Sequence, residues 1–369
     1  MAWTGYQKFL ALLLVATGSI NTLATKWSDT LYSVGSDGQL RLFQHPFLQA
    51  STMFLGEMLC LLTFKVLICG CTRRLTATTN PSSLIRGNTE FSPFILTVPA
   101  VLDLIGTSTM YIGLNLTYAS SFQMFRGSII VFTAILSVAF LDKKIKVREW
   151  FGIGTIIIGL LIVGASDFLD KDSTQIYGHN SIITGDLLII MAQIISAAQM
   201  VYEEKYVSGL DIPPLQAVGW EGVFGFVILF FLQIIFYYIP APAPFNQNAR
   251  HTVEDAIDGL VQIGNNGLLV LAVLGGIISI AFFNFAGISV TKEMSATTRM
   301  VLDSVRTLII WAVSLSLGWQ SFHWPQLLGF GVLVLGMCVY NNVLCNPFAR
   351  SRANPDLEEP IVNRDAATE

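Results

Sequence analysis

The sequence predicts an all-α polytopic membrane protein with ten transmembrane helices arranged as two inverted five-helix repeats. Three observations predict this fold class: an apolar composition, ten apolar segments of spanning length, and an internal repeat. Of the 369 residues, 53% are hydrophobic and only 12% are charged, whereas a soluble globular domain is typically about 25% charged. The mean hydropathy is +0.61. This composition excludes a disordered chain and argues against an enzyme of the aqueous phase.

Ten apolar segments divide the chain, each close to the length of about 20 residues that a helix needs to cross a bilayer core. They cover residues 5–24, 46–69, 93–115, 117–141, 147–166, 183–203, 214–239, 265–288, 294–317 and 323–343. The first segment begins with a short region that contains Lys8 and has the alternative interpretation of a signal peptide. Its polar second half and poor cleavage region favour an uncleaved transmembrane helix.

The internal repeat defines the predicted domains. Residues 5–166 form the first five-helix repeat and residues 183–343 the second, with residues 1–24 holding the first helix and a short cytoplasmic N-terminus. Residues 344–369 are expected to form a disordered cytoplasmic tail. Because five is an odd number, the second repeat enters the membrane from the opposite side. Transporters with such inverted repeats hold their site near the membrane midplane.

Two alignments of the chain with itself support the repeat. A shift of 167 residues aligns residues 46–50 with residues 213–217. A shift of 177 residues aligns three glycines of the fifth segment with three of the tenth, pairing Gly152 with Gly329, Gly154 with Gly331 and Gly159 with Gly336.

The lysines and arginines of the loops predict the orientation. With a cytoplasmic N-terminus, twelve basic residues lie on the cytoplasmic side and four on the other. The twelve are Arg73, Arg74, Arg86, Lys143, Lys144, Lys146, Arg148, Lys205, Lys292, Arg350, Arg352 and Arg364; the four are Lys26, Arg41, Lys171 and Arg250. Both termini are therefore expected to be cytoplasmic.

Ionisable residues inside the predicted spans are candidates for function, because charge within the hydrocarbon is costly. Arg126 and Asp303 each lie about nine residues, or about 13 Å, into their spans, which places both near the midplane. They are equivalent under the shift of 177 residues, so we expect them to meet close to the pseudo-two-fold axis. Arg299, Asp303 and Arg306 share one helical face through their spacing.

These arginines have two interpretations. Guanidinium groups fit carboxylate and phosphate, so Arg126, Arg299 and Arg306 can bind an anionic group of a substrate. Alternatively, they form a polar lock with Asp303 that only specifies packing. Gln123 and Asn284 complete the candidate residues for substrate binding or gating, although interhelical hydrogen bonding is the commoner role of such amides.

The intramembrane carboxylates are assigned separately. Glu221 is a candidate for proton coupling, because burial favours the neutral form of a carboxylate; the alternative is a neutral side chain hydrogen-bonded to a neighbour. Glu57 and Asp103 are expected to be structural polar residues.

The sequence carries no motif for catalysis or metal binding. It has no Walker A motif and no HExxH, and its five cysteines, at positions 60, 69, 71, 338 and 345, lack metal-ligand spacing. We expect no enzyme activity, no cofactor and no metal. A net charge of -4 provides no basic field for nucleic acid.

Three segments resemble motifs of the solute carrier family 35 group in the drug/metabolite transporter superfamily: residues 120–127 (SSFQMFRG), 185–193 (GDLLIIMAQ) and 295–307 (SATTRMVLDSVRT). The resemblance extends from Trp3 to about Asn342. It implies ten helices in two EamA-type repeats, a central cavity and alternating access. Relatives in the wider family carry nucleotide sugars in the Golgi and endoplasmic reticulum. The most similar subgroup has no settled substrate and is placed mainly in the lysosomal membrane, with a mitochondrial association also proposed.

We therefore expect a secondary transmembrane transporter of a small polar or anionic organic solute. The alternative is a non-transporting membrane scaffold on a transporter fold, linked to lysosomal or mitochondrial homeostasis. The expected partners are the unidentified small molecule and membrane lipid, a homodimer is left open, and nucleic acid is not expected. The lysosomal membrane is the expected location, with Golgi or endosomal membrane and mitochondrion as alternatives.

Overall fold

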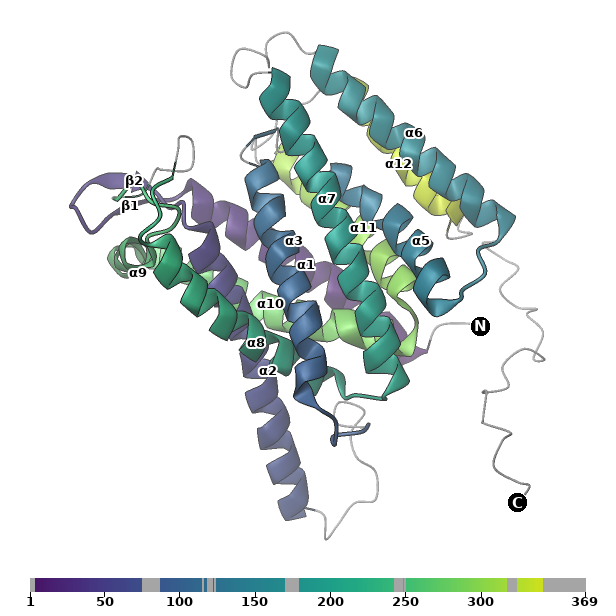
Figure 1. Ribbon diagram of the computed structural model, residues 1–369, viewed down its shortest axis with the longest axis horizontal. Coiled ribbons are helices and arrows are strands. Elements are labelled where there is room, and N and C mark those ends of the chain that lie inside the picture. Colours follow the sequence, from purple (N-terminus) through teal and green to yellow (C-terminus); the bar gives the residue numbers. More distant parts are fainter. Residues whose placement is uncertain are drawn as a thin grey trace.

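The computed structural model describes residues 4–74, 87–114, 116–117, 122, 124–169, 179–241, 248, 250–316 and 324–340 (Figure 1). The elements in chain order are α1 (Gly5–Thr30), β1 (Tyr32–Val34), β2 (Leu40–Leu42), α2 (Pro46–Arg74), the 3₁₀ turn η1 (Pro93–Leu96), α3 (Thr97–Leu114), the 3₁₀ turn η2 (Arg126–Ser128), α5 (Ile129–Leu141), α6 (Val147–Leu169), α7 (His179–Glu203), the π-helical turn η4 (Glu204–Ser208), α8 (Pro214–Phe236), α9 (Ala256–Asn265), α10 (Gly267–Glu293), α11 (Ala296–Ser316) and α12 (Trp324–Tyr340). The predicted tail at residues 344–369 lies outside the described residues.

A helix occupies each of the ten ranges predicted as membrane spans. Within the described part of the chain, six helices are long and apolar enough to cross a membrane: Gly5–Thr30, Pro46–Cys69, Pro93–Leu114, Ser181–Ser208, Pro214–Phe236 and Gly267–Glu293. Two further apolar helices are shorter, Arg126–Leu141 and Leu327–Tyr340. The chain is thus a polytopic helical membrane protein.

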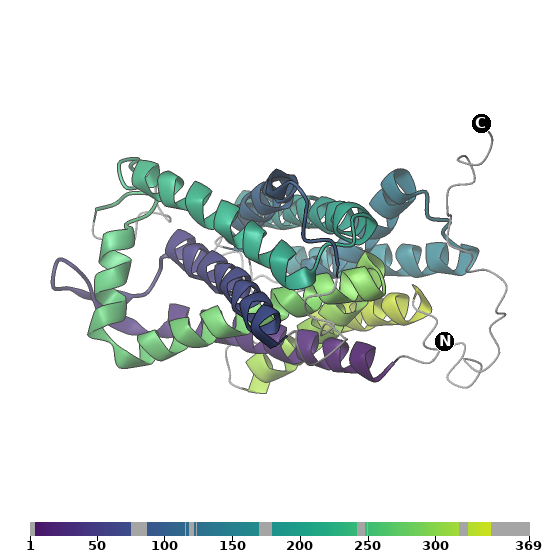
Figure 2. The same ribbon diagram turned by 90° about the horizontal axis from the view of Figure 1, so that it is seen from below.

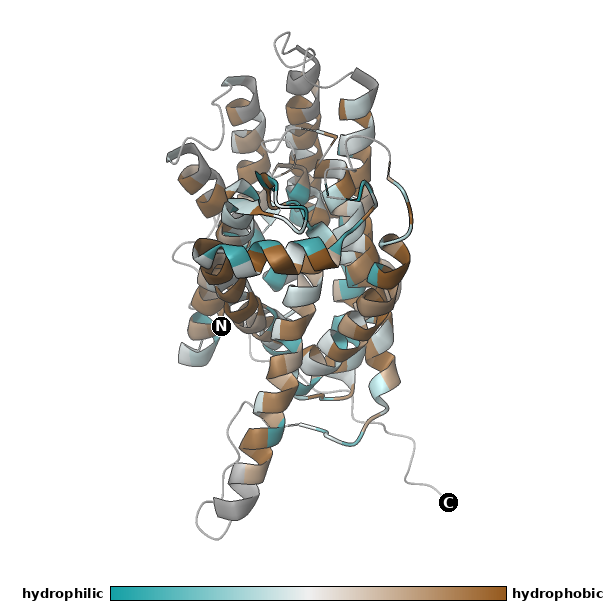
Figure 3. Cartoon of the chain, turned by 90° about the vertical axis from the view of Figure 1, so that its left-hand side faces the viewer, coloured by the Kyte–Doolittle hydropathy of each residue, from teal (hydrophilic) through white to brown (hydrophobic). Residues whose placement is uncertain are grey.

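Large apolar side chains cover the outside of the helices, as expected for a surface that contacts lipid. Leu12, Leu62, Phe140, Phe151 and Leu161 are all more than half exposed. Soluble monomers rarely expose contiguous apolar patches of this kind. The hydropathy colouring of Figure 3 shows the same brown surface along most helices, with polar positions toward the interior and the ends.

The helices pack in four main pairs: α1 with α10, α2 with α8, α3 with α7, and α6 with α12. In Figure 1, α6 and α12 lie side by side at one edge of the molecule, and α2 and α8 lie toward the opposite edge. Each pair joins one helix from residues 5–166 to one from residues 183–343, so the two halves are interleaved and the space between them is central.

Glycines allow the closest of these approaches. A Cβ atom added at Gly159 of α6 would lie 2.9 Å from the carbonyl oxygen of Gly329 in α12. A Cβ atom added at Gly336 would lie 3.0 Å from the carbonyl oxygen of Gly152. The two backbones meet at both positions, and a side chain at either glycine would force them apart.

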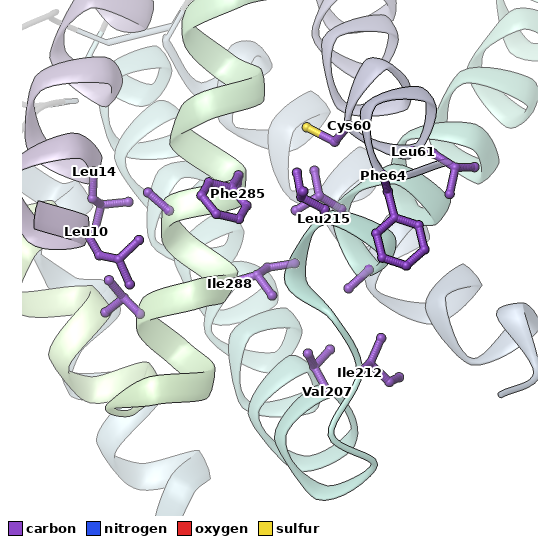
Figure 4. Close-up of a cluster of buried hydrophobic side chains, with 14 of the residues drawn as sticks. Leu10, Leu14, Cys60, Leu61, Phe64, Val207, Ile212, Leu215, Phe285 and Ile288 are labelled. Carbon is purple, nitrogen blue, oxygen red and sulfur yellow. The ribbon is translucent and has the colours of Figure 1, made fainter. Parts of the chain in front are cut away.

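A buried apolar cluster fixes the helices that surround one end of the central space (Figure 4). Leu10 and Leu14 of α1 pack there with Phe64 of α2, Phe285 of α10 and Ile212 of the connection into α8. Because α2, α8 and α10 also carry charged or polar residues of the site described below, this cluster holds those residues in a fixed relation.

A polar cap that the sequence analysis did not anticipate lies at the opposite end of these helices. The antiparallel hairpin of β1 and β2 pairs Ser33 with Arg41, and helix α9 lies beside the hairpin in Figure 2 and Figure 1. In the cap, His45 Nδ1 lies 2.7 Å from Glu254 Oε1. Glu254 Oε2 also accepts a hydrogen bond of 2.9 Å from the backbone nitrogen of Phe47 in the first turn of α2. Glu254 therefore anchors the connection before α9 to the start of α2.

Candidate functional site

A cavity of about 440 Å³ lies between the two halves of the molecule. Its lining draws on α1, α2, α3, η2, α7, α8, α10 and α11. The charged lining residues among those described are the carboxylates Asp29, Glu57, Asp103, Glu203, Glu221 and Asp303 and the basic residues Lys26, Arg126, Arg299 and Arg306. Every ionisable residue that the sequence analysis proposed for the midplane therefore lines one cavity.

Arg126 and Asp303 meet in this cavity, as their equivalent positions predict. Arg126 Nη2 lies 4.0 Å from Asp303 Oδ2. Arg306 is the closer partner of this carboxylate, because its Nη2 lies 2.8 Å from Asp303 Oδ1. The guanidinium of Arg306 also lies 4.7 Å from the ring centroid of Phe283. One carboxylate thus faces two guanidinium groups, which leaves donors free to bind an anionic or polar atom of a solute.

The backbone at Arg126 interrupts its span. Residues Arg126–Ser128 form a 3₁₀ turn, and the regular helix α5 begins only at Ile129. A 3₁₀ stretch inside a longer helix often marks a hinge, and broken helices surround the substrate sites of many transporters. The turn therefore places a charged side chain at a point where the helix can bend.

Arg299 lines the same cavity but has a partner of its own. Its Nη1 atom lies 2.5 Å from Glu203 Oε2, and both side chains are buried. A Cβ atom added at Gly287 of α10 would lie 2.8 Å from Arg299 Nε, so a glycine makes room for the guanidinium. The pair joins the start of α11 to the end of α7.

The sequence analysis did not propose Glu203 as a site residue. This glutamate ends the predicted span at residues 183–203, where a carboxylate is usually assigned to the membrane interface. Its position one residue before the π-helical turn Glu204–Ser208 was the available signal, because such turns occur frequently at functional sites.

Three carboxylates of the cavity form no ion pair with any described residue. Glu57 accepts a hydrogen bond from Asn284 Nδ2, and Asp103 Oδ1 accepts one of 3.2 Å from Thr107 Oγ1. Glu221 is buried, and its Oε1 atom has no hydrogen-bond partner among the described residues. Glu57 and Asp103, expected to be purely structural, therefore lie beside the same space as Glu221.

The cavity reaches further along α1 than the predicted span did. The predicted first span ends at residue 24, but α1 continues past it and brings Lys26 and Asp29 into the lining. Gln49 Nε2 donates a hydrogen bond of 2.6 Å to Asp29 Oδ1. The hydroxyl of Thr25 donates to the carbonyl oxygen of Asn21 at 3.0 Å, so this polar part of the helix satisfies its own groups.

Of the other proposed residues, Asn284 lines the cavity through its contact with Glu57. Gln123 lies outside the described residues. No group of three or more His, Cys, Asp or Glu side chains suited to a metal ion occurs in the part of the chain that the structure describes.

Comparisons with known proteins give consistent results. A family model described as nucleotide-sugar transporter matches residues 8–216. Solute carrier family 35 member F6 of Homo sapiens is 52% identical over 361 residues, which cover 97% of this chain and 95% of that protein. The Rattus norvegicus protein of the same name is 53% identical over 344 residues, which cover 93% and 90% of the two chains.

One solved crystal structure aligns with this fold at a TM-score of 0.56 and 13% sequence identity. The alignment covers 92% of this chain and 98% of the other. At this identity the likeness concerns the fold alone.

Proposed function

Because the chain belongs to solute carrier family 35, we propose that it is a secondary transporter that moves a small polar organic solute across a membrane by alternating access. The observation that carries the proposal is the central cavity of about 440 Å³, whose charged lining comes from both halves of the chain. Its volume falls in the range of about 300–1,000 Å³ that is typical of small-molecule sites.

The helix pairing supports two inverted repeats that move against each other. Exchanging the five predicted spans of one half for those of the other turns the α1–α10 pair into the α7–α3 pair. The same exchange leaves the α2–α8 and α6–α12 pairs unchanged, so all four main pairs obey one pseudo-two-fold relation. The glycine contacts obey it too: Gly159 meets Gly329, and Gly336 meets Gly152. Rocking of two such halves is the usual form of alternating access.

The Arg299–Glu203 pair is proposed as the gate at the cytoplasmic end of the cavity. It links α11 of the second half to the end of α7 with both charges buried. Lys292 Nζ, which lies 2.7 Å from Asp211 Oδ1, adds a second link at the same helix ends. In this proposal the pairs hold the cytoplasmic end closed, and they separate when the cavity opens toward the cytosol.

The charge balance of the lining bears on the solute class. Six carboxylates and four basic residues line the cavity among the described residues. Arg126 and Arg306 offer donors to an anionic or polar group, whereas Glu57, Asp103 and Glu221 offer acceptors to a cationic or hydroxyl-rich group. This balance favours an amphoteric polar solute over a polyanion, because excess negative charge repels a polyanion.

Glu221 is proposed to couple transport to protons. Its Oε1 atom lacks a hydrogen-bond partner among the described residues and its side chain lines the cavity. A buried carboxylate beside a solute site can exchange a proton as the cavity changes access. We also propose a lysosomal membrane location and cytoplasmic termini, which rest on the family resemblance and on the distribution of loop lysines and arginines.

Uptake into liposomes that contain the purified chain tests the proposal. A panel of radiolabelled amino acids, organic amines, nucleosides and nucleotide sugars would be screened with and without a pH gradient. Saturable flux of one class, lost in Arg306→Gln, is the expected result. Folded, inserted protein that moves no member of the panel would contradict the proposal and favour the alternative of a membrane scaffold.

A further inference from the structure

A second cavity, of about 380 Å³, lies at one end of the helix bundle. Its lining combines the end of α5, the connection into α6, the start of α11 and the end of α12. Since four helix ends meet there, the cavity lies at a membrane face rather than at the midplane. Its polar lining includes Ser137, Lys143, Lys144, Arg148 and Glu149. We call these five residues and the space between them the basic end pocket.

Two of the three basic residues in the basic end pocket lack a counter-charge. Lys143 forms an ion pair with Glu204, and Glu149 Oε2 accepts a hydrogen bond of 2.9 Å from the backbone nitrogen of Lys146. Lys144 and Arg148 form no ion pair with any residue that the structure describes. The pocket therefore offers two cationic groups to an anion that comes from outside the chain.

Buried donors without partners face the same conclusion. The Ser137 side chain is 2% exposed, and its hydroxyl has no hydrogen-bond partner among the described residues. The Nε atom of Arg148 is likewise buried without a partner in the described part of the chain. A buried polar group that makes no hydrogen bond is costly. A multidentate oxyanion in the pocket would satisfy both groups and the two cationic side chains together.

Apolar side chains beside the pocket indicate where the anion comes from. Val147, Trp150 and Phe151 at the start of α6 are all more than half exposed, and α6 lies at the edge of the molecule in Figure 1. Tryptophan is enriched where a membrane meets water. A phosphate attached to acyl chains would place its headgroup on Lys144 and Arg148 and its chains along the apolar start of α6.

We propose that the basic end pocket binds the phosphate-bearing headgroup of an anionic phospholipid, held by Lys144 and Arg148 with the Ser137 hydroxyl as a further donor. Basic pockets between transmembrane helices on the cytoplasmic side are a recurring form of lipid recognition. The twelve-to-four distribution of basic residues is expected to place this pocket on that side. A lipid bound there would bridge α5 and α6 of the first half to α11 and α12 of the second. This assignment does not depend on which solute the central cavity takes.

The test measures binding of the full chain in nanodiscs by native mass spectrometry and by thermal unfolding. Nanodiscs of phosphatidylcholine alone are compared with nanodiscs that also contain phosphatidylinositol phosphate. The variant is Lys144→Ala with Arg148→Ala. The matched control, Lys65→Ala with Lys205→Ala, removes two exposed lysines that do not line the pocket. We expect the pocket variant to bind the anionic lipid at least tenfold more weakly, with the control unchanged and both variants folded.

Each other outcome overturns the proposal. Equal losses in the pocket variant and the control would assign binding to general surface charge. Undiminished binding in the pocket variant would remove the site. A separate arm adds inorganic phosphate or soluble inositol trisphosphate to protein in phosphatidylcholine nanodiscs. Stabilisation by either soluble anion at the lipid's concentration would assign the pocket to a free phosphate compound instead of a lipid.

Discussion

Arg126 and Asp303 occupy the same position in the two halves of the chain, and Arg126 Nη2 lies 4.0 Å from Asp303 Oδ2 in the central cavity. Residues related by a pseudo-two-fold axis approach each other only when both lie close to that axis. The pair therefore marks the centre of the cavity, where a solute would contact both halves at once. Arg306, at 2.8 Å from the same carboxylate, makes Asp303 the shared acceptor of two guanidinium groups.

A double-mutant cycle tests this pair. Removing one partner of a buried ion pair typically costs about 3–5 kcal/mol, and a smaller loss is expected here because both side chains retain some exposure. Asp303→Ala should be more destabilising than Arg126→Ala, because it leaves two guanidinium groups without their carboxylate. The double variant should lose less stability than the two single losses together, measured by thermal unfolding in detergent. Single effects that add within about 0.5 kcal/mol would contradict a direct interaction.

The Arg299–Glu203 pair predicts a change in access rather than in affinity. Arg299→Gln removes the charge that holds α11 to the end of α7, so the cytoplasmic end should open more often. A cysteine placed at Ser196, which lines the cavity, should then react several-fold faster with a membrane-impermeant maleimide added from the cytoplasmic side. Lys205→Gln, an exposed change on the same side, serves as the control. An unchanged labelling rate in Arg299→Gln would show that this pair does not gate the cavity.

The ten helical ranges and the Arg126–Asp303 contact were predictable from the sequence, because apolar length and repeat equivalence act over whole segments. Glu203, Lys26 and Asp29 were not, since each lies at a boundary where hydropathy cannot separate a cavity residue from an interfacial one. The cap around His45 was also missed. It depends on hydrogen bonds between segments more than 200 residues apart in sequence, such as that from Phe47 to Glu254.

Glu221→Gln tests proton coupling. The substitution keeps the shape of the side chain, and Glu221 Oε1 makes no hydrogen bond with a described residue that would be lost. The variant should therefore fold and bind solute but lose uptake driven by a pH gradient, measured in liposomes. Glu293→Gln, at an exposed position, is the control and should keep it. Full pH dependence in Glu221→Gln would leave this carboxylate a structural role only.

Asp258 in the polar cap predicts a pH-dependent contribution to stability. Burial by itself would raise the pKa of this carboxyl group. Hydrogen bonds from Ser36 and Gln262 outweigh burial and, with the charge of Arg41, hold the pKa of Asp258 below its ordinary value. A lowered folded-state pKa means that the stabilisation is complete above the unfolded-state pKa of about 4 and is lost as the pH falls through the folded-state value.

Asp258→Asn should therefore lower the melting temperature at pH 7, and the gap to the parent protein should narrow as the pH falls below about 4. Thermal unfolding in detergent across this pH range measures the effect. Asp142→Asn changes an exposed aspartate outside the cap and should leave the melting temperature nearly unchanged at every pH. A constant gap between Asp258→Asn and the parent protein at all pH values would contradict the assignment.

The contact between α6 and α12 predicts opposite effects of one substitution at two glycines of the same helix. A Cβ atom at Gly159 would lie 2.7 Å from the backbone nitrogen of Leu333, whereas a Cβ atom at Gly154 would meet nothing within 4 Å. Gly159→Ala should destabilise the protein by about 1–3 kcal/mol, because the two backbones must separate. Gly154→Ala should be neutral or stabilising by up to about 1 kcal/mol, because alanine is the better helix former. Thermal unfolding of the two variants decides the matter: if both shift the melting temperature in the same direction by similar amounts, close backbone packing at Gly159 does not hold the halves together.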